Sequence, residues 1–390
     1  MSMNSMYFTE EHQVFRKSFK EFLQKEVVPH IEKWEKTGKI ERFIWEKFGE
    51  MGYFGLHISE EYGGLDLDIF YTIIFLEELQ KINSGGIAAA MWAHTYLAMT
   101  HLEKEGSEAL KQHYLTASIA GNLIGCLCIS EPFAGSDVSG MRTTAVKKGT
   151  TYIINGSKTF ITNGVYSDYL IVAAKTDADA RHSGISIFLV DRETPGVSAT
   201  KLDKLGWRAS DTGEIAFDNV EIPAKNLMGN EGKGFPYIMQ HFALERLAMA
   251  INAHARAEYA IEYAINYMKE RSTFGKTLDK YQALRHKIAE MTSEVEMSKN
   301  FNYAIAKRLN NGDYVVKEAS MCKLTATKIA DNVIYEALQL LGGYGYMEEY
   351  PMARLFRDSR LGPIGGGTSE ILKEIIAKIV IDEKDYKPSI

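Results

Sequence analysis

The chain has 390 residues, of which 45% are hydrophobic and 25% charged, and its net charge is −6 at pH 7. That length is too great for one simple core and indicates two or three domains. Acidic and basic residues are interspersed, so the sequence offers no concentrated basic patch for nucleic acid or an anionic membrane.

The N-terminal residues and the cysteines narrow the class of protein further. Residues 1–22 mix Glu with Lys and Arg and lack the apolar core of a signal peptide. No stretch approaches the roughly 20 apolar residues of a membrane span. Three cysteines predict neither a disulfide framework nor a metal site, and Cys126 and Cys128 share one strand face, where they would pack as small hydrophobes. We therefore expect a cytoplasmic, bacterial-type protein.

The hydrophobic period changes twice along the chain. From Thr9 to Ile119 the sequence follows a helical period, as at Phe15, Phe19 and Phe22. Short β-rich runs follow at 123–129, 152–154, 169–173, 185–190 and 214–217, separated by Asn155-Gly156, Asn163-Gly164 and Pro195-Gly196, which predicts an antiparallel sheet or barrel. The helical period returns at Phe235 and persists to about Ile381. We expect an α+β multidomain fold with domains at 1–121, 122–233 and 234–390.

Two segments of the β region carry ligand-binding features. Residues 128–140, CISEPFAGSDVSG, leave an apolar strand for a loop of small residues and hydroxyls, which suits a flat polar ligand or an ordinary β-turn. Residues 158–163, KTFITN, place Phe160 and Thr162 on one strand face, an aromatic surface beside a hydroxyl. Such a pair suits a stacked heteroaromatic ring but is also common in plain sheets.

Two glycine-rich segments lie in the C-terminal region. Residues 339–345, QLLGGYG, hold more glycines than a helix cap needs and lead to Arg354 and Asp358. Residues 365–370, GGGTSE, open the last predicted helix, whose N-terminal N–H groups attract an anion or a carbonyl oxygen.

Glu245 stands out because it falls in an apolar helical stripe with Phe242 and Met249. The helix is apolar nearly all round, which predicts a buried position. A buried carboxylate is costly unless it is paired or used, and the adjacent Arg246 does not face it on a helix. On the residues alone, an ion pair to another helix is a better-supported interpretation than catalysis.

Together these segments resemble the acyl-CoA dehydrogenase family over essentially the whole chain. Residues 128–140 and the segment from Gln339 to Asp358 match that family's two signature patterns without a break, and RSTFGK at 271–276 lies between them. The resemblance implies a helical–β–helical fold with FAD between the β domain and the C-terminal helices. It also implies that a neighbouring subunit completes the FAD site, in a homotetramer built as a dimer of dimers.

The resemblance assigns a set of residues to the FAD site. They are Leu127, Ile129, Ser130, Gly135 and Ser136 along one side of the flavin, Phe160 and Thr162 beside flavin N5, Arg271, Thr273, Phe274, Tyr281 and Gln282 in the partner-subunit arm, Gln339, Gly342 and Gly343 at the adenosine end, and Thr368 and Glu370 after the glycine run. Many relatives have Gln where this chain has Glu370.

One departure from the family pattern identifies the expected base. Many members carry the catalytic Glu just before the Gly-Thr of the last segment, where this chain has Gly366. Isovaleryl- and long-chain-type members carry it on the buried helix, in a pair matching Glu245-Arg246, and the surrounding residues look closest to the long-chain type. The resemblance therefore reverses the ion-pair interpretation of Glu245. It leaves the N–H of Gly366 to bind the thioester carbonyl with the flavin ribityl 2′-hydroxyl.

The implied reaction is FAD-dependent α,β-dehydrogenation of a medium-chain, long-chain or branched acyl-CoA to a trans-2-enoyl-CoA. Glu245 would take the α-proton, flavin N5 the β-hydride, and an electron-transferring flavoprotein the electrons. Ser136, Arg246, Gly367 and His94 match the substrate side. The alternatives are a flavin oxidase or monooxygenase of the same fold, and a non-catalytic DNA-associated flavoprotein, which would be expected to have a basic surface.

Overall fold

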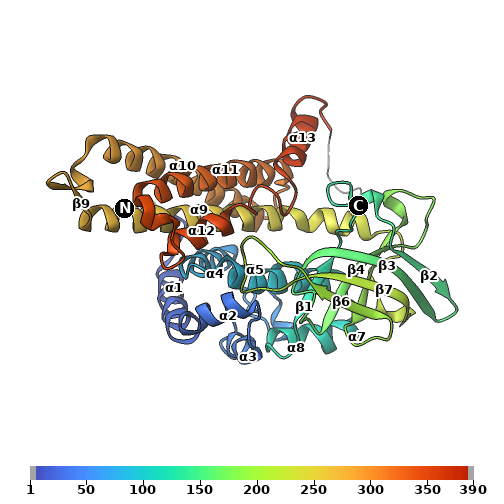
Figure 1. Ribbon diagram of the computed structural model, residues 1–390. Coiled ribbons are helices and arrows are strands. Elements are labelled where there is room, and N and C mark those ends of the chain that lie inside the picture. The colour runs from blue at the N-terminus through green and yellow to red at the C-terminus, as the bar shows by residue number, and fades with distance from the viewer. Residues whose placement is uncertain (1–5, 385–390) are drawn as a thin grey trace.

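The computed structural model describes residues 6–384, which form a helical part, a sheet and a second helical part in chain order (Figure 1). The long C-terminal helices lie across the top of the view, with the N-terminal helices and the sheet side by side beneath them. This confirms the predicted helical–β–helical fold. The boundaries at 121/122 and 233/234 stay predictions. No helix within the described residues is long and apolar enough to cross a membrane.

Short helices make up the N-terminal part. They are α1 (Glu10–Phe22), α2 (Ile31–Thr37), α3 (Arg42–Glu50), α4 (Ile69–Lys81), α5 (Gly85–Trp92), α6 (Thr100–Glu105), α7 (Glu108–Leu110) and α8 (Thr116–Ile119). Helix α1 begins at a capping box in which the Thr9 side chain and the His12 ring each accept a hydrogen bond from the other residue's backbone N–H. Phe19 and Phe22 are buried, as their helical spacing predicts.

The sheet has eight strands. They are β1 (Gly125–Cys128), β2 (Thr144–Lys148), β3 (Thr151–Thr162), β4 (Tyr169–Lys175), β5 (Ile185–Asp191), β6 (Val197–Lys201), β7 (Thr212–Pro223) and β8 (Leu227–Met228). Their order is β6-β7-β3-β2-β4-β5-β8, and β1 pairs with β4. The β1–β4 and β2–β4 pairings are parallel, so the sheet is mixed and not wholly antiparallel as predicted. Turn dipeptides indicate hairpins between consecutive strands, whereas β1 pairs with β4, and strands β2 and β3 lie between them in the chain.

One predicted turn is wrong. Asn155-Gly156 lies inside β3, where the register with β7 shifts between Ile154 and Gly156. A Cβ on Gly156 would lie 2.5 Å from Thr143 Oγ1, so the glycine serves close backbone approach at a bulge. Cys126 and Cys128 are fully buried with their Sγ atoms 3.6 Å apart, which confirms that they share one face of β1.

Long helices dominate the C-terminal part. The helices are α9 (Gly234–Glu270), α10 (Gln282–Asn310), α11 (Val316–Leu341), α12 (Pro351–Ser359) and α13 (Ser369–Val380). Strands β9 (Ser272–Thr273) and β10 (Lys276–Thr277) form a hairpin that projects from the end of the molecule opposite the sheet (Figure 1). Every residue of α9 from Glu245 to Ala257 is buried, which confirms the predicted central helix.

Asp358 joins all three parts of the chain. Its buried carboxylate accepts hydrogen bonds from the backbone N–H of Gly85 at 2.9 Å and of Trp207 at 2.6 Å. Its carbonyl oxygen accepts from Arg256 of α9 at 2.8 Å. The second signature segment therefore ends in a residue that fixes the N-terminal helices and the sheet against α9.

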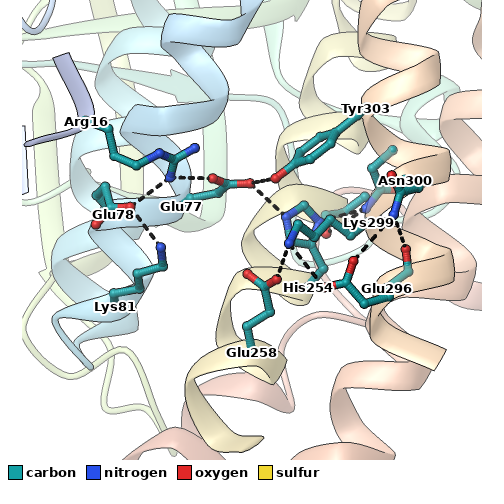
Figure 2. Close-up of polar contacts among 12 residues, drawn as sticks. Arg16, Glu77, Glu78, Lys81, His254, Glu258, Glu296, Lys299, Asn300 and Tyr303 are labelled. Carbon is teal, nitrogen blue, oxygen red and sulfur yellow. Dashed lines mark hydrogen bonds and ion pairs between the residues drawn. The ribbon is translucent and has the colours of Figure 1, made fainter. Parts of the chain in front are cut away.

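Figure 2 shows a second joint, where α4 meets α9 and α10. The buried carboxylate of Glu77 accepts hydrogen bonds from Arg16 at 2.7 Å, from His254 at 3.1 Å and from the Tyr303 hydroxyl. Burial alone would raise the pKa of Glu77, but His254 and Arg16 hold that pKa well below its usual range. A buried charge is tolerated only when it is this fully paired, so the cluster fixes α9 against the N-terminal helices.

Candidate active site

Glu245 lies on α9 at the start of its fully buried stretch and is 9% exposed. Helix α9 packs between α11 and α4. Across residues 6–384 no Lys, Arg or His nitrogen forms an ion pair with this carboxylate. The structure therefore lacks the ion pair that the residues alone favoured, and the buried carboxylate needs another explanation.

The backbone of Gly366 faces the carboxylate of Glu245. A Cβ built on Gly366 would lie 3.2 Å from Glu245 Oε1 and 2.4 Å from Met249 Sδ. The two positions at which the family is expected to carry its base therefore converge on one point. Met249 fills the space that a side chain on residue 366 would occupy.

The environment of Glu245 moves the pKa of its carboxyl group close to neutral pH. Burial raises the pKa of Glu245 to about 7, although the positive charges of Arg246 and Lys323 pull that pKa down. Desolvation disfavours the ionised carboxylate because burial removes most of its contact with solvent. A carboxyl group with a pKa near the working pH is suited to general base catalysis.

Arg246 and Lys323 are the cations closest to the site. Arg246 is buried, with its guanidinium 5.6 Å from the centre of the Phe242 ring and a hydrogen bond of 3.4 Å to the Ser320 hydroxyl of α11. Burial lowers the pKa of Arg246, although the negative charge of Glu245 opposes that shift. The Lys323 ammonium donates a hydrogen bond to the carbonyl oxygen of Gly367.

The glycine run has a conformation that requires glycine. Gly366 has φ +60° and Gly367 has φ +90°, in the left-handed region that L side chains rarely adopt. Thr368 then caps α13, since its hydroxyl accepts a hydrogen bond from the N–H of Ile371 at 3.3 Å. Glu370 lies in the first turn of α13 with its side chain mostly exposed.

The first signature segment follows β1 and is held by a buried ion pair that the sequence motifs did not reveal. Lys158, which is fully buried, donates to Glu131 at 2.7 Å and to the carbonyl of Ile129 at 3.1 Å. Glu131 also accepts from the N–H of Thr143 at 3.1 Å. A lysine within an apolar strand, one residue before the Thr-Phe pair, is the signal that could have found it. Beyond this anchor Gly135 and Ser136 are exposed.

Phe160 and Thr162 lie beside the first signature segment. The N–H of Thr159 donates to the carbonyl of Ser130 at 2.9 Å, which joins β3 to the loop after β1. A bulge between Lys158 and Ile161 gives Phe160 a φ of +60° and leaves its side chain 71% exposed. Thr162, which follows the buried Ile161 in the sequence, is half-buried. An exposed aromatic side chain on a strained backbone suits a ring that stacks on it.

The remaining predicted FAD residues gather at the far end of α9. A cavity of about 600 Å³ there is lined by Arg271, Thr273, Gln339, Gly342 and Gly343. Both glycines have open space where a Cβ would lie.

The rest of the predicted arm lies near this cavity. Phe274 is 95% exposed at the tip of the hairpin. The Tyr281 hydroxyl donates to the carbonyl of Thr273 at 2.6 Å, and Gln282 begins α10. Two segments distant in sequence, the arm and the Gln339–Gly343 run, thus share one surface.

This second group cannot reach the first within one subunit. Glu245 and Arg271 lie 26 positions apart on or directly after one helix, which separates them by about 39 Å. Figure 1 shows the hairpin and the sheet at opposite ends of the molecule. The exposed Phe160 ring, the open Gly135 loop and the glycine-lined cavity each fit part of FAD, but the cavity lies too far from the other two for all three to hold one molecule.

His94 has a structural place in this molecule, contrary to its predicted contact with substrate. Its ring is fully buried, Nδ1 accepts from the N–H of Gly125 at 3.0 Å, and Nε2 lies 3.4 Å from the carbonyl oxygen of Ser118. Burial lowers the pKa of His94 to about 4, so the ring is neutral at pH 7. Both ring nitrogens are used to join the N-terminal helices to β1, which leaves none to bind a ligand.

Comparisons with known proteins agree with this geometry. Three family models match in order: acyl-CoA dehydrogenase N-terminal domain (residues 9–122), middle domain (residues 126–220) and C-terminal domain (residues 232–381). The mitochondrial long-chain specific acyl-CoA dehydrogenase of Sus scrofa is 41% identical over 380 residues, covering 97% of this chain and 88% of its own length. The mitochondrial isovaleryl-CoA dehydrogenase of Arabidopsis thaliana is 37% identical, with 98% and 94% covered.

A crystal structure of acyl-CoA dehydrogenase from Geobacillus kaustophilus superposes with a TM-score of 0.92 at 43% identity, covering 95% of this chain and 98% of its own. The chain therefore belongs to the acyl-CoA dehydrogenase family, as its two signature segments predicted. It is an oxidoreductase of a family that uses FAD.

Two further structures bear on the cofactor and on the rival reaction. A glutaryl-CoA dehydrogenase from Mycobacterium smegmatis, 28% identical with a TM-score of 0.92, was solved in complex with FADH2, covering 99% of this chain and 98% of its own. The prolyl acyl carrier protein oxidase AnaB, 31% identical with a TM-score of 0.90, covers 95% and 99%. A protein of this fold can therefore be an oxidase, so the fold alone does not identify the electron acceptor.

Proposed function

We propose that the protein removes hydrogen from the α and β carbons of an acyl-CoA, with Glu245 as the base that takes the α-proton. The observation that carries this proposal is the approach of the buried Glu245 carboxylate to Gly366, where other members of the family carry their base. A pKa of about 7 allows the carboxylate to accept a proton at neutral pH and release it afterwards.

The surrounding residues would bind the thioester and keep water away. The N–H of Gly366 would donate to the thioester carbonyl oxygen, where negative charge develops as the α-proton leaves. Ser136, Arg246 and Gly367 are proposed substrate contacts. When bound, FAD supplies the acceptor for the β-hydride. The product is a trans-2-enoyl-CoA, and an electron-transferring flavoprotein is the proposed electron acceptor.

The substrate class is proposed as straight medium-to-long or methyl-branched acyl-CoA. The support is that the relatives in the comparisons include long-chain and isovaleryl-CoA dehydrogenases. Turnover of an acyl-CoA panel with an artificial electron acceptor measures this preference. Activity confined to a dicarboxylic acyl-CoA such as glutaryl-CoA would overturn it.

Glu245→Gln tests the base. This variant keeps the shape of the side chain but cannot accept the α-proton, so turnover should fall by at least about a hundredfold, the usual contribution of general base catalysis. Glu262→Gln, an exposed change on the same helix, is the matched control and should keep full turnover. Wild-type-like turnover by Glu245→Gln with bound FAD would rule Glu245 out.

A companion test moves the base. Glu245→Gly combined with Gly366→Glu should regain part of the activity with an altered chain preference. Met249 occupies the space that the new side chain needs, so adding Met249→Ala should increase the recovery. Complete inactivity of both combinations with FAD bound would show that the two base positions are not interchangeable in this chain.

An oxidase of the same fold is the second candidate, and the similarity to the prolyl acyl carrier protein oxidase favours testing it. Oxygen consumption during turnover of an acyl-CoA distinguishes the two. A dehydrogenase consumes little oxygen and depends on an added acceptor, whereas an oxidase needs oxygen alone.

We also propose that each FAD site is shared between two subunits of a homo-oligomer, with a homotetramer as the expected assembly. The support is the separation of about 39 Å between Glu245 and Arg271, which one cofactor molecule cannot bridge. Mixing inactive Glu245→Gln and Arg271→Ala subunits tests it. A heterodimer would hold one intact site of two, so random pairing should restore about a quarter of wild-type activity. No recovery after verified subunit exchange would contradict shared sites.

A further inference from the structure

Lys323 is a buried lysine beside the proposed base. Its side chain lies on α11 and is fully buried, like that of Lys158. Lys158 pairs with Glu131, whereas within the described residues no carboxylate lies within ion-pair distance of the Lys323 ammonium. Burying an ammonium without an ion pair is costly, so an explanation is needed for its position.

The hydrogen bond of Lys323 supplies part of that explanation. The ammonium donates to the carbonyl oxygen of Gly367, the second of two glycines with left-handed backbone. Such a turn has many alternative conformations, because glycine restricts its own backbone least. A hydrogen bond from a charged donor is stronger than one from a neutral donor. Lys323 therefore holds the turn that contains the N–H of Gly366.

The same stripe of α11 contacts the rest of the site. Ser320, one turn before Lys323, accepts the hydrogen bond from Arg246. Thr327, one turn after Lys323, lies close to Gly362. A Cβ built on Gly362 would be 3.2 Å from Thr327 Cγ2. One face of α11 thus contacts Arg246, the turn at Gly366 and Gly367, and Gly362, which precedes the glycine segment.

We propose that Lys323 is a positioning residue of the dehydrogenation site, which holds the Gly366–Gly367 turn and, together with Arg246, provides positive charge that favours the ionised form of Glu245. This inference rests on the proposed role of Glu245 as the base. Lys323 itself is not a group that exchanges a proton with the substrate. It acts through two neighbours, the backbone of Gly367 and the carboxylate of Glu245.

The charges around the site give the expected direction of the effect. Four charged or titratable groups act on one another there: Glu245 and Arg246 from α9, Lys323 from α11, and Tyr314 before α11. Burial lowers the pKa of Lys323 to about 8, although Glu245 opposes that shift, so the ammonium stays largely charged at pH 7. That charge lowers the pKa of Glu245. Removing it should raise the pH at which the base becomes active.

Three variants of the FAD-bound enzyme separate the two contributions. Lys323→Met removes the charge and the hydrogen bond, Lys323→Gln keeps a donor without charge, and Lys323→Arg keeps both. The measurement is the pH profile of kcat/KM, whose acidic limb reports the free enzyme's base. Lys328→Met, an exposed change one turn further along α11, is the matched control.

We expect Lys323→Met and Lys323→Gln to move the acidic limb up by about one pH unit, because each removes a charge beside the base. Lys323→Arg and Lys328→Met should leave it unmoved. The plateau rate should fall at least tenfold in Lys323→Met and less in Lys323→Gln. If Lys323→Met does not fold, the limb of Lys323→Gln still decides the charge.

An unmoved limb and a plateau within threefold of wild type in the neutral variants would overturn the inference. Failure of the inference is distinguishable from failure of the proposed base. If Glu245→Gln loses turnover while the neutral Lys323 variants behave as wild type, only the role of Lys323 is wrong. If Glu245→Gln keeps turnover, the base is wrong, and a shifted limb in the Lys323 variants would then belong to another group.

Discussion

Glu245 should make the folded protein less stable at alkaline pH, and this cost can be measured without any substrate. Its pKa rises from 4.5 to about 7 on burial, so the folded state holds the proton more tightly than the unfolded chain does. Below about pH 4.5 the carboxyl group is protonated in both the folded and the unfolded state, so its burial as a charge costs no stability. Its cost grows as pH rises and is complete above about pH 7.

The size of this cost follows from the shift. At 1.36 kcal/mol per pKa unit, a rise from 4.5 to about 7 corresponds to about 3 kcal/mol at pH 8 and somewhat under 1 kcal/mol at pH 5. Glu245→Gln cannot ionise, so it should be the more stable protein. With an unfolding entropy near 2.1 cal/mol/K per residue over 390 residues, the gain in Tm should be about 4 °C at pH 8 and about 1 °C at pH 5.

The assay is thermal unfolding of the FAD-bound wild type and Glu245→Gln at both pH values, with matched scan rates. Glu262→Gln, on the exposed side of the same helix, controls for the loss of a charge as such and should give equal shifts at both pH values. A Tm gain that does not depend on pH would show that burial does not raise the pKa of Glu245. So would destabilisation by Glu245→Gln at pH 8, because it would mean that the carboxylate is paired after all.

Three other substitutions test separate parts of the structure. Gly366→Ala should cost about 1–2 kcal/mol of backbone strain. It should also lower turnover at least tenfold, because its methyl group would displace Met249 and press on Glu245. Adding Met249→Ala should recover part of that loss in a turnover assay. Lys158→Met leaves the buried Glu131 carboxylate unpaired, so it should lose about 3–5 kcal/mol in denaturant unfolding and bind less FAD; normal unfolding would contradict the pairing. Asp358→Ala should lower Tm and speed proteolysis between the three parts of the chain, and unchanged protection would show that this joint is dispensable.

Local periodicity predicted the features that depend on neighbouring residues. The buried α9 and the helical–β–helical order follow from hydrophobic spacing, because each helix or strand buries one face or all of itself. The short strands β2, β6 and β8 were not predicted, since their residues are largely polar or few. The sequence predicted a turn at Asn155-Gly156 because the Asn-Gly dipeptide is typical of hairpin turns, but here it forms a β-bulge.

Contacts between distant segments could not be predicted from spacing. The approach of Glu245 to Gly366, the pairing of Lys158 with Glu131 and the place of Lys323 depend on how separate segments pack. The resemblance to known dehydrogenases suggested that positions 245 and 366 are alternatives for one base. The structure supplies the physical reason, since both point to the same space. A lysine in the buried stripe of α11 was the only local signal for Lys323.

The most direct test of Glu245 as the base is a single turnover without oxygen. Wild-type and Glu245→Gln enzyme, each with FAD bound, are mixed with excess acyl-CoA, and the loss of flavin absorbance is followed. This measurement isolates removal of the two hydrogens from later electron transfer. We predict that Glu245→Gln binds acyl-CoA with near-normal affinity and that its flavin is reduced at least about a hundredfold more slowly. Reduction at a rate within threefold of wild type would contradict it.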